Sequence, residues 1–400
     1  MIGKINGSAP YLGNAAAEAA WTLIQATEAK EIDTLKRRRD LAAWARSDAP
    51  GVTAPGGAAM APLDGAAVQD YLRRVFPAEG DLTVTDVHLI RGGRSKETVM
   101  IGLTGTGSLP DRLVMRGDVV GGLVPSRVVD EFPLLQIAQR HGIPLPTPLH
   151  AEPATDALGR SFILVHGVSG RSLGDYFPEV GEGVPPSHRQ KIGLELAGIL
   201  ARLHAIPLSE FEGTRLDLSV DLRALVTDAI ESTYAQARSF ADPPRILIEL
   251  AYRWLKDNID LADDRPCVIH CNVGLHNMLI DGDRISALLD WELACVASPA
   301  REIAKILHLI DYLMLRQEFY AVYVAAGGPA NAVQPERVAF YAVMNSLITN
   351  QRVRYGSHLF YFGAQRNMVT ANVGYDYFLR NSMLLSKAVE DAQALPGRAA

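Results

Sequence analysis

The order in which strand-like and helix-like segments follow one another restricts the fold of this chain most. Three short segments rich in β-branched residues, at 82–90, 97–103 and 112–116, are joined by short connections. Such connections favour antiparallel neighbours, because a parallel pair needs a crossover of a dozen or more residues. FILVH at 162–166 predicts one more strand, and from about residue 187 the helical period dominates. We therefore expect an α+β protein with a small antiparallel sheet lobe and a larger helical lobe, not the alternating βαβ pattern of a dinucleotide fold.

The same pattern divides the chain into three parts. An Ala-rich segment at 15–47 has apolar residues at helical spacing, and the Pro- and Gly-rich segment 48–62 indicates a linker. We expect residues 1–62 to be a helical extension with this linker, 63–167 the smaller lobe, and 168–400 the helical lobe. The extension could pack on its own chain or on a second subunit, which leaves a homodimer through this helix open.

Composition narrows the class of partner. The net charge of −6 argues against a nucleic-acid ligand, because phosphate backbones require a basic surface. The single basic run, KRRR at 36–39, is interpreted as a solvated helix face, with a docking patch for an acidic partner as the alternative. We find neither a leader nor an apolar segment of membrane-spanning length, so the expected location is the cytoplasm, away from membranes.

Three cysteines are present, at 267, 271 and 295. An odd and low number fits a reducing compartment and provides no disulfide framework. Cys267, His270 and Cys271 are close enough in sequence to suggest a metal site. No second Cys/His pair follows at zinc-finger spacing, so zinc is not expected.

A polar loop lies between two short apolar segments at 267–280, CVIHCNVGLHNMLI. Loops of this kind between buried segments commonly carry chemistry. The next apolar segment, ISALLD, ends in Asp290. Asn277 and Asp290 thus follow adjacent predicted strands, and two oxygen-bearing side chains are enough for Mg²⁺, which takes its other ligands from phosphates and water.

The two segments HCNVGLHN and LLDWE resemble the aminoglycoside phosphotransferase family, a kinase-like and choline-kinase-like group with the signature H-G-D-x-x-x-x-N followed by I-D-W-E. Over most of 64–310 the chain is similar to the phosphotransferase domains associated with acyl-CoA dehydrogenases. Three further segments match the family in the same order: LIRGGRSKETVMIGL at 89–103, PSRVVDEFPLL at 125–135 and LARLHAI at 200–206. The resemblance implies a protein-kinase-like fold.

The resemblance also implies a role for individual residues. The turn that covers the nucleotide phosphates comprises Gly92, Gly93, Arg94 and Ser95. Arg116 occupies the position of the phosphate-binding cation, and Glu131 orients it. Val165 and His166 form the hinge against adenine, and His270 braces the catalytic loop. Asn277 and Asp290 hold Mg²⁺, as the corresponding Asn and Asp do in kinases.

The chain departs from the family at the position of the catalytic Asp, which is Asn272. An amide can orient a hydroxyl group but cannot accept its proton. Phosphoryl transfer depends mainly on positioning and charge neutralisation, so both reduced activity and no activity are open. The Gly before it is Cys271, and the family's G-D-P-x-x-D-L reads ASPAREI, with Ser298 and Glu302.

Each motif also has a purely structural interpretation. Gly92 and Gly93 could form a plain hairpin turn, His204 could be a hydrogen-bonded helix residue, and Arg116 with Glu131 could be an ordinary ion pair. The segment GRSLG at 170–174 fits the G-x-S-x-G pattern of serine hydrolases. Because no strand leads directly into Ser172, we do not expect it to be a nucleophile. No Walker-type phosphate motif is present.

Two functional hypotheses follow. The first is a phosphotransferase that uses Mg²⁺ and ATP, or another nucleoside triphosphate, to phosphorylate a hydroxyl group of a small molecule. Aminoglycosides are polycations and require an acidic pocket, whereas the segment 341–363 is aromatic and partly basic, so a less polar or anionic acceptor is favoured. The second is a nucleotide-binding regulatory protein of the pseudokinase type, which the amide of Asn272 favours.

Overall fold

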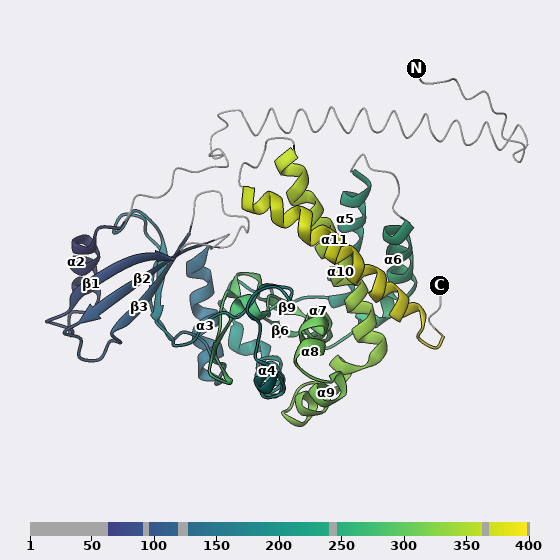
Figure 1. Ribbon diagram of the computed structural model, residues 1–400, viewed down its shortest axis with the longest axis horizontal. Coiled ribbons are helices and arrows are strands. Elements are labelled where there is room, and N and C mark those ends of the chain that lie inside the picture. The colour runs from purple at the N-terminus through teal and green to yellow at the C-terminus, as the bar shows by residue number, and fades with distance from the viewer. Residues whose placement is uncertain (1–62, 91–95, 119–126, 240–245, 362–367, 398–400) are drawn as a thin grey trace, which may run out of the picture.

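The computed structural model describes residues 63–90, 96–118, 127–239, 246–361 and 368–397, and from 355 to 376 only the backbone. The expected extension at 1–62 and the expected phosphate-covering turn, Gly92 to Ser95, lie outside these residues. A sheet with two helices forms one lobe, and the remaining helices form the larger lobe (Figure 1). The structure thus has the two-lobed α+β architecture that the sequence predicts.

The smaller lobe is a five-stranded antiparallel sheet in the order β1-β2-β3-β5-β4. Its strands are β1 (Thr83–Ile90), β2 (Lys96–Thr104), β3 (Arg112–Asp118), β4 (Pro148–Glu152) and β5 (Phe162–His166). Alternate residues of the central strands are buried, as period-2 patterning requires. In register, Val99 on β2 pairs with Met115 on β3, and Met115 pairs with Leu164 on β5. All three belong to the core of this lobe.

Two helices frame the sheet. The first, α2 (Gly65–Val75), begins at Asp64, whose side chain accepts a hydrogen bond from the backbone N–H of Ala67, as expected of an N-cap. It buries an apolar face against the sheet core. The second, α3 (Phe132–Arg140), follows the 3₁₀ turn η1 (Val128–Glu131). It lies on the side of the sheet that faces the helical lobe (Figure 1).

The larger lobe is built from helices around one apolar core. Its α-helices are α4 (Pro186–Ala205), α5 (Leu222–Ser239), α6 (Ile246–Asp257), α7 (Pro299–Lys305), α8 (Leu307–Leu313), α9 (Arg316–Ala325), α10 (Pro335–Tyr361) and α11 (Met368–Gln393). Single 3₁₀ turns also occur: η2 (Leu208–Phe211), η3 (Ile259–Ala262) and η6 (Ala330–Val333). The long helices α10 and α11 pack along each other, and α10 also packs on α7 (Figure 1). None of the helices that the structure describes has the length and apolar character needed to cross a bilayer.

Two short antiparallel ladders in the larger lobe hold the polar loops. One pairs β6 (Cys267–Ile269) with β9 (Cys295–Ala297), and the other pairs β7 (Met278–Asp281) with β8 (Arg284–Leu288). The turns η4 (Leu275–Asn277) and η5 (Trp291–Leu293) follow β6 and β8. One detail differs from expectation. The strand predicted to end in Asp290 ends at Leu288, because Asp290 has a left-handed backbone (φ 66°) that a strand cannot continue through.

Candidate active site

A buried carboxylate on α7 holds the loop that follows β6. The backbone N–H groups of His270 and Cys271 donate to the two oxygens of Glu302 on α7, over 3.0 and 2.6 Å. The Nε2 of His204, on α4, lies 3.0 Å from the same carboxylate, and its Nδ1 lies 2.7 Å from the Tyr323 hydroxyl. Burial alone would raise the pKa of Glu302, but the hydrogen bonds from His204 and the loop outweigh it and lower that pKa. Glu302 is therefore an ionised anchor for the loop.

His270 connects this loop to the segment before Asp290. Its Nδ1 accepts a hydrogen bond from the backbone N–H of Asn272 over 3.2 Å, so this nitrogen carries no proton. The proton is then on Nε2, which lies 3.0 Å from the carbonyl oxygen of Leu289 and donates to it. Complete burial lowers the pKa of His270, which keeps the ring neutral. The structure thus places His270 where a bracing residue of the loop would be.

Two non-glycine residues of the site have left-handed backbones, Cys271 (φ 62°) and Asp290 (φ 66°). Asp tolerates this conformation, whereas Cys does so at a cost of roughly 1–3 kcal/mol. Cys271 takes the place of the glycine in the family signature, and glycine would adopt this φ without strain. The surrounding hydrogen bonds to Glu302 hold the strained residue in position.

One arginine connects the two lobes. Arg116 on β3 contacts Oε2 of Glu131 through Nη1 over 3.1 Å and Oδ1 of Asp290 through Nη2 over 2.9 Å. Glu131 is fully buried at the start of α3, and its Oε1 has no hydrogen-bond partner among the described residues. Burial raises the pKa of Glu131, while the charge of Arg116 opposes that rise. The predicted Arg116–Glu131 pair is present, and it extends across the lobe boundary to Asp290.

The second oxygen of Asp290 is held from the other side. The amide Nδ2 of Asn272 donates to Oδ2 of Asp290 over 3.1 Å. The amide nitrogen of Asn277 donates to the backbone carbonyl of Asn272 over 2.9 Å, and the Asn277 carbonyl accepts from the N–H of Leu289 over 2.8 Å. Asn272, Asn277 and Asp290 therefore form one connected cluster.

This cluster suits a hard divalent cation. The amide nitrogen of Asn277 is engaged with the protein, which leaves its side-chain oxygen as a ligand atom. Each oxygen of Asp290 accepts one hydrogen bond and keeps a further lone pair. Oxygen donors of this type are what Mg²⁺ prefers, so the residues present fit the ion that the family pattern implies.

Lys96 is a cation that the sequence analysis did not select. It lies at the start of β2, is buried, and contacts Oδ1 of Asp118 over 2.7 Å. Asp118 also accepts from the backbone N–H of Val128 and from the Ser161 hydroxyl. Lys96 directly follows the segment expected to cover the phosphates, and this position in the sequence could have identified it as a candidate site residue.

The predicted hinge residues lie at the end of β5. Val165 pairs with Val114 on β3 and is buried, and His166 pairs with Leu113. The backbone N–H of His166 donates to the carbonyl of Thr147 over 2.9 Å. The structure places both residues where the sheet leads into the helical lobe, and contact with adenine stays a prediction.

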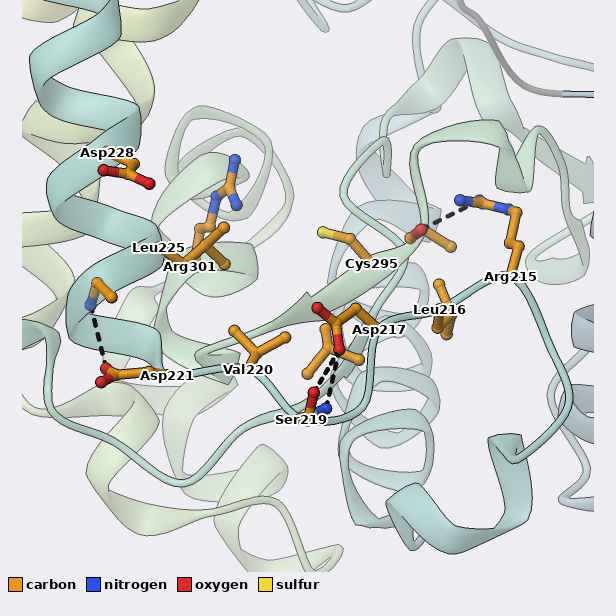
Figure 2. Close-up of a pocket in the computed structure, with 13 residues that line it drawn as sticks. Arg215, Leu216, Asp217, Ser219, Val220, Asp221, Leu225, Asp228, Cys295 and Arg301 are labelled. Carbon is orange, nitrogen blue, oxygen red and sulfur yellow. Dashed lines mark hydrogen bonds between the residues drawn. The ribbon is translucent and has the colours of Figure 1, made fainter.

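A pocket of about 450 Å³ lies in the helical lobe between the start of α5 and β9 (Figure 2). The segment before α5 contributes Arg215, Asp217 and Asp221, α5 contributes Asp228, β9 contributes Cys295, and α7 contributes Arg301. Arg215 is engaged with the carbonyl oxygens of residues 291, 292 and 294. The lining is thus of mixed charge. The sequence analysis did not predict it, because its two walls come from distant parts of the chain.

Ser172 lies apart from this constellation. Its hydroxyl donates to the carbonyl of Leu275 over 2.9 Å. The preceding strand, β5, ends at His166, and no helix begins at Ser172. The arrangement is not a nucleophile elbow, in agreement with the sequence analysis.

Curated relatives support the resemblance drawn from the motifs. Acyl-CoA dehydrogenase family member 11 of Rattus norvegicus is 26% identical over 246 residues, covering 59% of this chain and 30% of that protein. The Homo sapiens protein of the same name is 25% identical over 253 residues, covering 60% and 30%. The chain therefore matches less than a third of the length of these relatives.

Solved structures support the fold. A Ralstonia eutropha structure, provisionally assigned as an aminoglycoside phosphotransferase, has a TM-score of 0.62 at 16% identity, over 82% of this chain and 99% of that chain. A thermostable mutant of aminoglycoside phosphotransferase APH(4)-Ia, in ternary complex with ADP and hygromycin B, has a TM-score of 0.56 at 15% identity, over 82% and 100%. A macrolide 2'-phosphotransferase type I has a TM-score of 0.51 at 20% identity, over 78% and 97%. The predicted kinase-like two-lobed fold is confirmed.

The family model described as "Phosphotransferase enzyme family" matches residues 86–341. This range includes all of the sheet except the first residues of β1, the loop after β6 and the residues around Asp290. With the acyl-CoA dehydrogenase relatives, it confirms the resemblance that HCNVGLHN and LLDWE indicate. The chain belongs to the phosphotransferase enzyme family.

Proposed function

We propose that this protein transfers a phosphoryl group from ATP, or another nucleoside triphosphate, to a hydroxyl group of a small molecule. The observation that carries the proposal is the bridge at Asp290. Its carboxylate is held at once by Arg116 of the sheet lobe and by Asn272 of the loop after β6. A neighbour of the same fold, crystallised with ADP, supports a nucleotide donor.

In this proposal the sheet lobe, within residues 63–167, covers the nucleotide. Arg116 presents a planar guanidinium that can engage phosphate oxygens with two donors. Glu131 fixes that guanidinium through Nη1 and is itself fixed by burial. An arginine held in this way loses little conformational entropy when a phosphate binds.

Asn277 and Asp290 would hold the magnesium ion. When bound, Mg²⁺ neutralises charge on the phosphates. The hydrogen bond from the Asn277 amide to the Asn272 carbonyl sets the orientation of one ligand, and Arg116 sets that of the other. A nucleotide phosphate would compete with Asp290 for Arg116, so loading the site would loosen the bridge between the lobes.

Asn272 would orient the acceptor hydroxyl without taking its proton. A positioned base contributes typically 10²–10⁴ in rate, and the remaining catalysis comes from positioning and charge neutralisation. We therefore propose slow turnover, with the acceptor proton leaving to water.

The mixed-charge pocket is the proposed acceptor site. Its lining includes Cys295, which pairs through β9 with Ile269 on β6, the strand that leads into the loop. Its lining combines three carboxylates, Asp217, Asp221 and Asp228, with the guanidinium groups of Arg215 and Arg301. A hydroxylated molecule that carries groups of both charges fits this lining better than a polycationic aminoglycoside, which would meet the two arginines.

One observation favours a second function, a nucleotide-binding regulatory protein without turnover. The amide nitrogen of Asn272 donates a hydrogen bond to Asp290. An ionised Asp at this position, as in the family, could not donate that bond. A protein selected for binding alone would tolerate this arrangement. The two functions share the nucleotide site and differ only in turnover.

Calorimetric titration of ATP into the full chain, with and without Mg²⁺, tests the shared part. We expect binding that depends on Mg²⁺ and is lost in Asp290→Ala. The matched control is Asp283→Ala, which removes an exposed aspartate that lies between β7 and β8 and is paired with Lys191. Absence of binding to the wild-type chain would contradict both functions. Transfer of labelled γ-phosphate to a pool of hydroxylated small molecules then separates them.

A further inference from the structure

Two of the three cysteines meet beneath the loop after β6. Ile269 on β6 pairs with Cys295 on β9, and Cys271 follows two residues later. The left-handed turn at Cys271 keeps its side chain in the small cluster that contains β6 and β9. The side chains of Cys271 and Cys295 are hydrogen-bonded to each other. Neither thiol has a role in the phosphotransferase site described above.

The surroundings of Cys271 favour its thiolate. The Nζ of Lys305 lies 4.0 Å from its Sγ, and Arg301 is also close. The hydrogen bond with Cys295, followed by these two positive charges, lowers the pKa of Cys271 well below its usual range despite burial. The same hydrogen bond and burial raise the pKa of Cys295. The pair therefore combines a nucleophilic sulfur with a protonated one.

Cys295 gives the pair access to solvent. It lines the mixed-charge pocket and is partly exposed, whereas Cys271 is buried and belongs to the same small cluster. Figure 2 shows the Cys295 sulfur among the lining side chains, directed away from the strand. A small uncharged oxidant such as hydrogen peroxide can enter a pocket of about 450 Å³. Cys267, on the same ladder, pairs with Ala297 and lies outside the pocket lining.

We propose that Cys271 and Cys295 are a modification site, a dithiol that peroxide oxidises reversibly to a disulfide. The Cys271 thiolate attacks one peroxide oxygen, the O–O bond breaks, and Cys271 becomes a sulfenic acid while the other oxygen leaves as hydroxide, which is protonated to water. The Cys295 sulfur then attacks the sulfenic sulfur. The S–S bond forms, the hydroxyl leaves as water with the thiol proton, and two electrons in total have passed to peroxide.

The disulfide would act on the loop through its neighbour. Cys271 directly precedes Asn272, whose amide holds Asp290, and Cys295 belongs to the pocket wall. A covalent bond between them restrains the loop against β9 and places a disulfide where the pocket has a free thiol. We expect weaker nucleotide or acceptor binding in the oxidised form, restored by a thiol reductant.

Thiol counting and intact mass of the native full chain test the chemistry without any assay of activity. After peroxide treatment we expect loss of two of the three free thiols, a mass lower by two hydrogens, and a peptide that links Cys271 with Cys295, all reversed by reduction. Cys267→Ser, the matched control, should still form the link. Cys295→Ser should instead give a sulfenic acid at Cys271 that dimedone captures.

Two results would overturn the proposal: three thiols retained after peroxide treatment that does oxidise the unfolded chain, or a link that includes Cys267. Cys271→Gly, which restores the unstrained family residue, should abolish the link while the chain stays folded. Comparing ATP affinity of the reduced and oxidised forms measures the consequence for the loop. Because the link is detected by mass, failure of the proposed phosphotransferase function leaves this test intact.

Discussion

The loop after β6 contacts one carboxylate on each of its two sides. We call the side that contacts Glu302 the underside and the side that contacts Asp290 the open face, and the two sides differ in how the carboxylate is held. Glu302, on the underside, is 1% exposed and accepts from two backbone N–H groups and from His204. Asp290, on the open face, has a side chain that is 23% exposed and accepts from two side chains, Arg116 and Asn272. The first arrangement is fixed by backbone and burial, whereas ligands can displace the second.

This difference explains which parts of the family pattern the chain retains. Glu302 occupies the position of the family's Asp in G-D-P-x-x-D-L, and an acidic residue there still anchors the loop. Asn272 occupies the position of the catalytic Asp, where the amide can donate to Asp290 but cannot accept the proton of an acceptor hydroxyl. The acidic support of the loop is therefore retained at Glu302, whereas the side that faces Asp290 has an amide in place of the catalytic acid.

The largest expected effect comes from Asn272→Asp, which restores a base on the open face. If an acceptor is phosphorylated at all, the variant should raise the rate of γ-phosphate transfer by roughly 10²–10⁴. Without Mg²⁺ the variant should be less stable, because two carboxylates then face each other where the amide now donates over 3.1 Å.

Asn272→Ala is the control for this substitution, because it removes the hydrogen bond and supplies no base. Equal transfer rates for Asp and Ala at 272, with ATP binding intact in both, would contradict the catalytic assignment and favour the regulatory function. The melting temperature with and without Mg²⁺ separates the stability effect from the rate effect.

On the underside, Glu302→Ala should destabilise the fold itself. It leaves the buried N–H groups of His270 and Cys271 and the ring of His204 without their acceptor, at a cost of about 3–5 kcal/mol. Glu302→Gln keeps one acceptor oxygen and should cost less, about 1–3 kcal/mol. Urea unfolding measures both. Similar costs for the two variants would contradict the view that the charge of Glu302 holds the loop.

Arg116→Lys tests whether the two separate contacts of Arg116 on the open face contribute to ATP binding. Lysine keeps the positive charge but cannot contact Glu131 and Asp290 through separate nitrogens of one planar group. Loss of one charge-assisted hydrogen bond, roughly 1.5 kcal/mol, should weaken ATP binding about tenfold. Arg140→Lys, at a mostly exposed arginine on α3, is the control. Unchanged affinity in Arg116→Lys would remove Arg116 from the nucleotide site.

The pH dependence of stability should be set by two buried groups at the underside, His270 and Glu302. The pKa of His270 is lowered in the folded chain, so its neutral form stabilises the fold above about pH 6.5, its ordinary value. As pH falls below that value the unfolded chain binds a proton first, and stability decreases. The pKa of Glu302 is also lowered from 4.5, so its contribution is present above that pH and declines as pH falls further.

Melting temperatures between pH 8 and pH 4 measure this decline. His88→Asn, at an exposed histidine of β1, should leave the profile unchanged. His270→Asn should lower the melting temperature at neutral pH and reduce the loss between about pH 6.5 and 5. A profile that is equally steep in both variants would show that another buried group controls the acid response.

The sequence allowed the sheet and the loop to be predicted because each depends on neighbours along the chain. Alternating buried apolar residues define β2 and β3, and Asp64 is recognisable as a cap next to the helix it starts. The contacts that join the site are different. Arg116 meets Asp290 across 174 positions, and His204 meets Glu302 across 98. A repeating pattern along the sequence relates only near neighbours and cannot reveal contacts over such separations. The family pattern therefore identified these residues, but it could not show that they contact each other.

Backbone conformation set a second limit on prediction. The apolar run before Asp290 suggested a strand through that residue, yet a left-handed φ ends the strand at Leu288. At Cys271 the same conformation occurs where the family has glycine, and the residue type gives no hint of it. The thiol pair became visible only when β6 and β9 were placed side by side.

The smallest expected effect belongs to Ser172, the residue whose motif was misleading. Its hydroxyl donates a hydrogen bond to the carbonyl of Leu275, the first residue of the turn that contains Asn277. Ser172→Ala should therefore cost about 1 kcal/mol of stability, shift ATP affinity little, and leave the chain as inactive on generic ester substrates as the wild type. Ester hydrolysis that disappears in Ser172→Ala would contradict this, because it would require a base that the described surroundings of Ser172 do not supply. Since Leu275 and Asn277 belong to the same turn, a small change in Mg²⁺-dependent ATP affinity is still expected, and its size measures how far the hydrogen bond from Ser172 influences the proposed magnesium ligand Asn277.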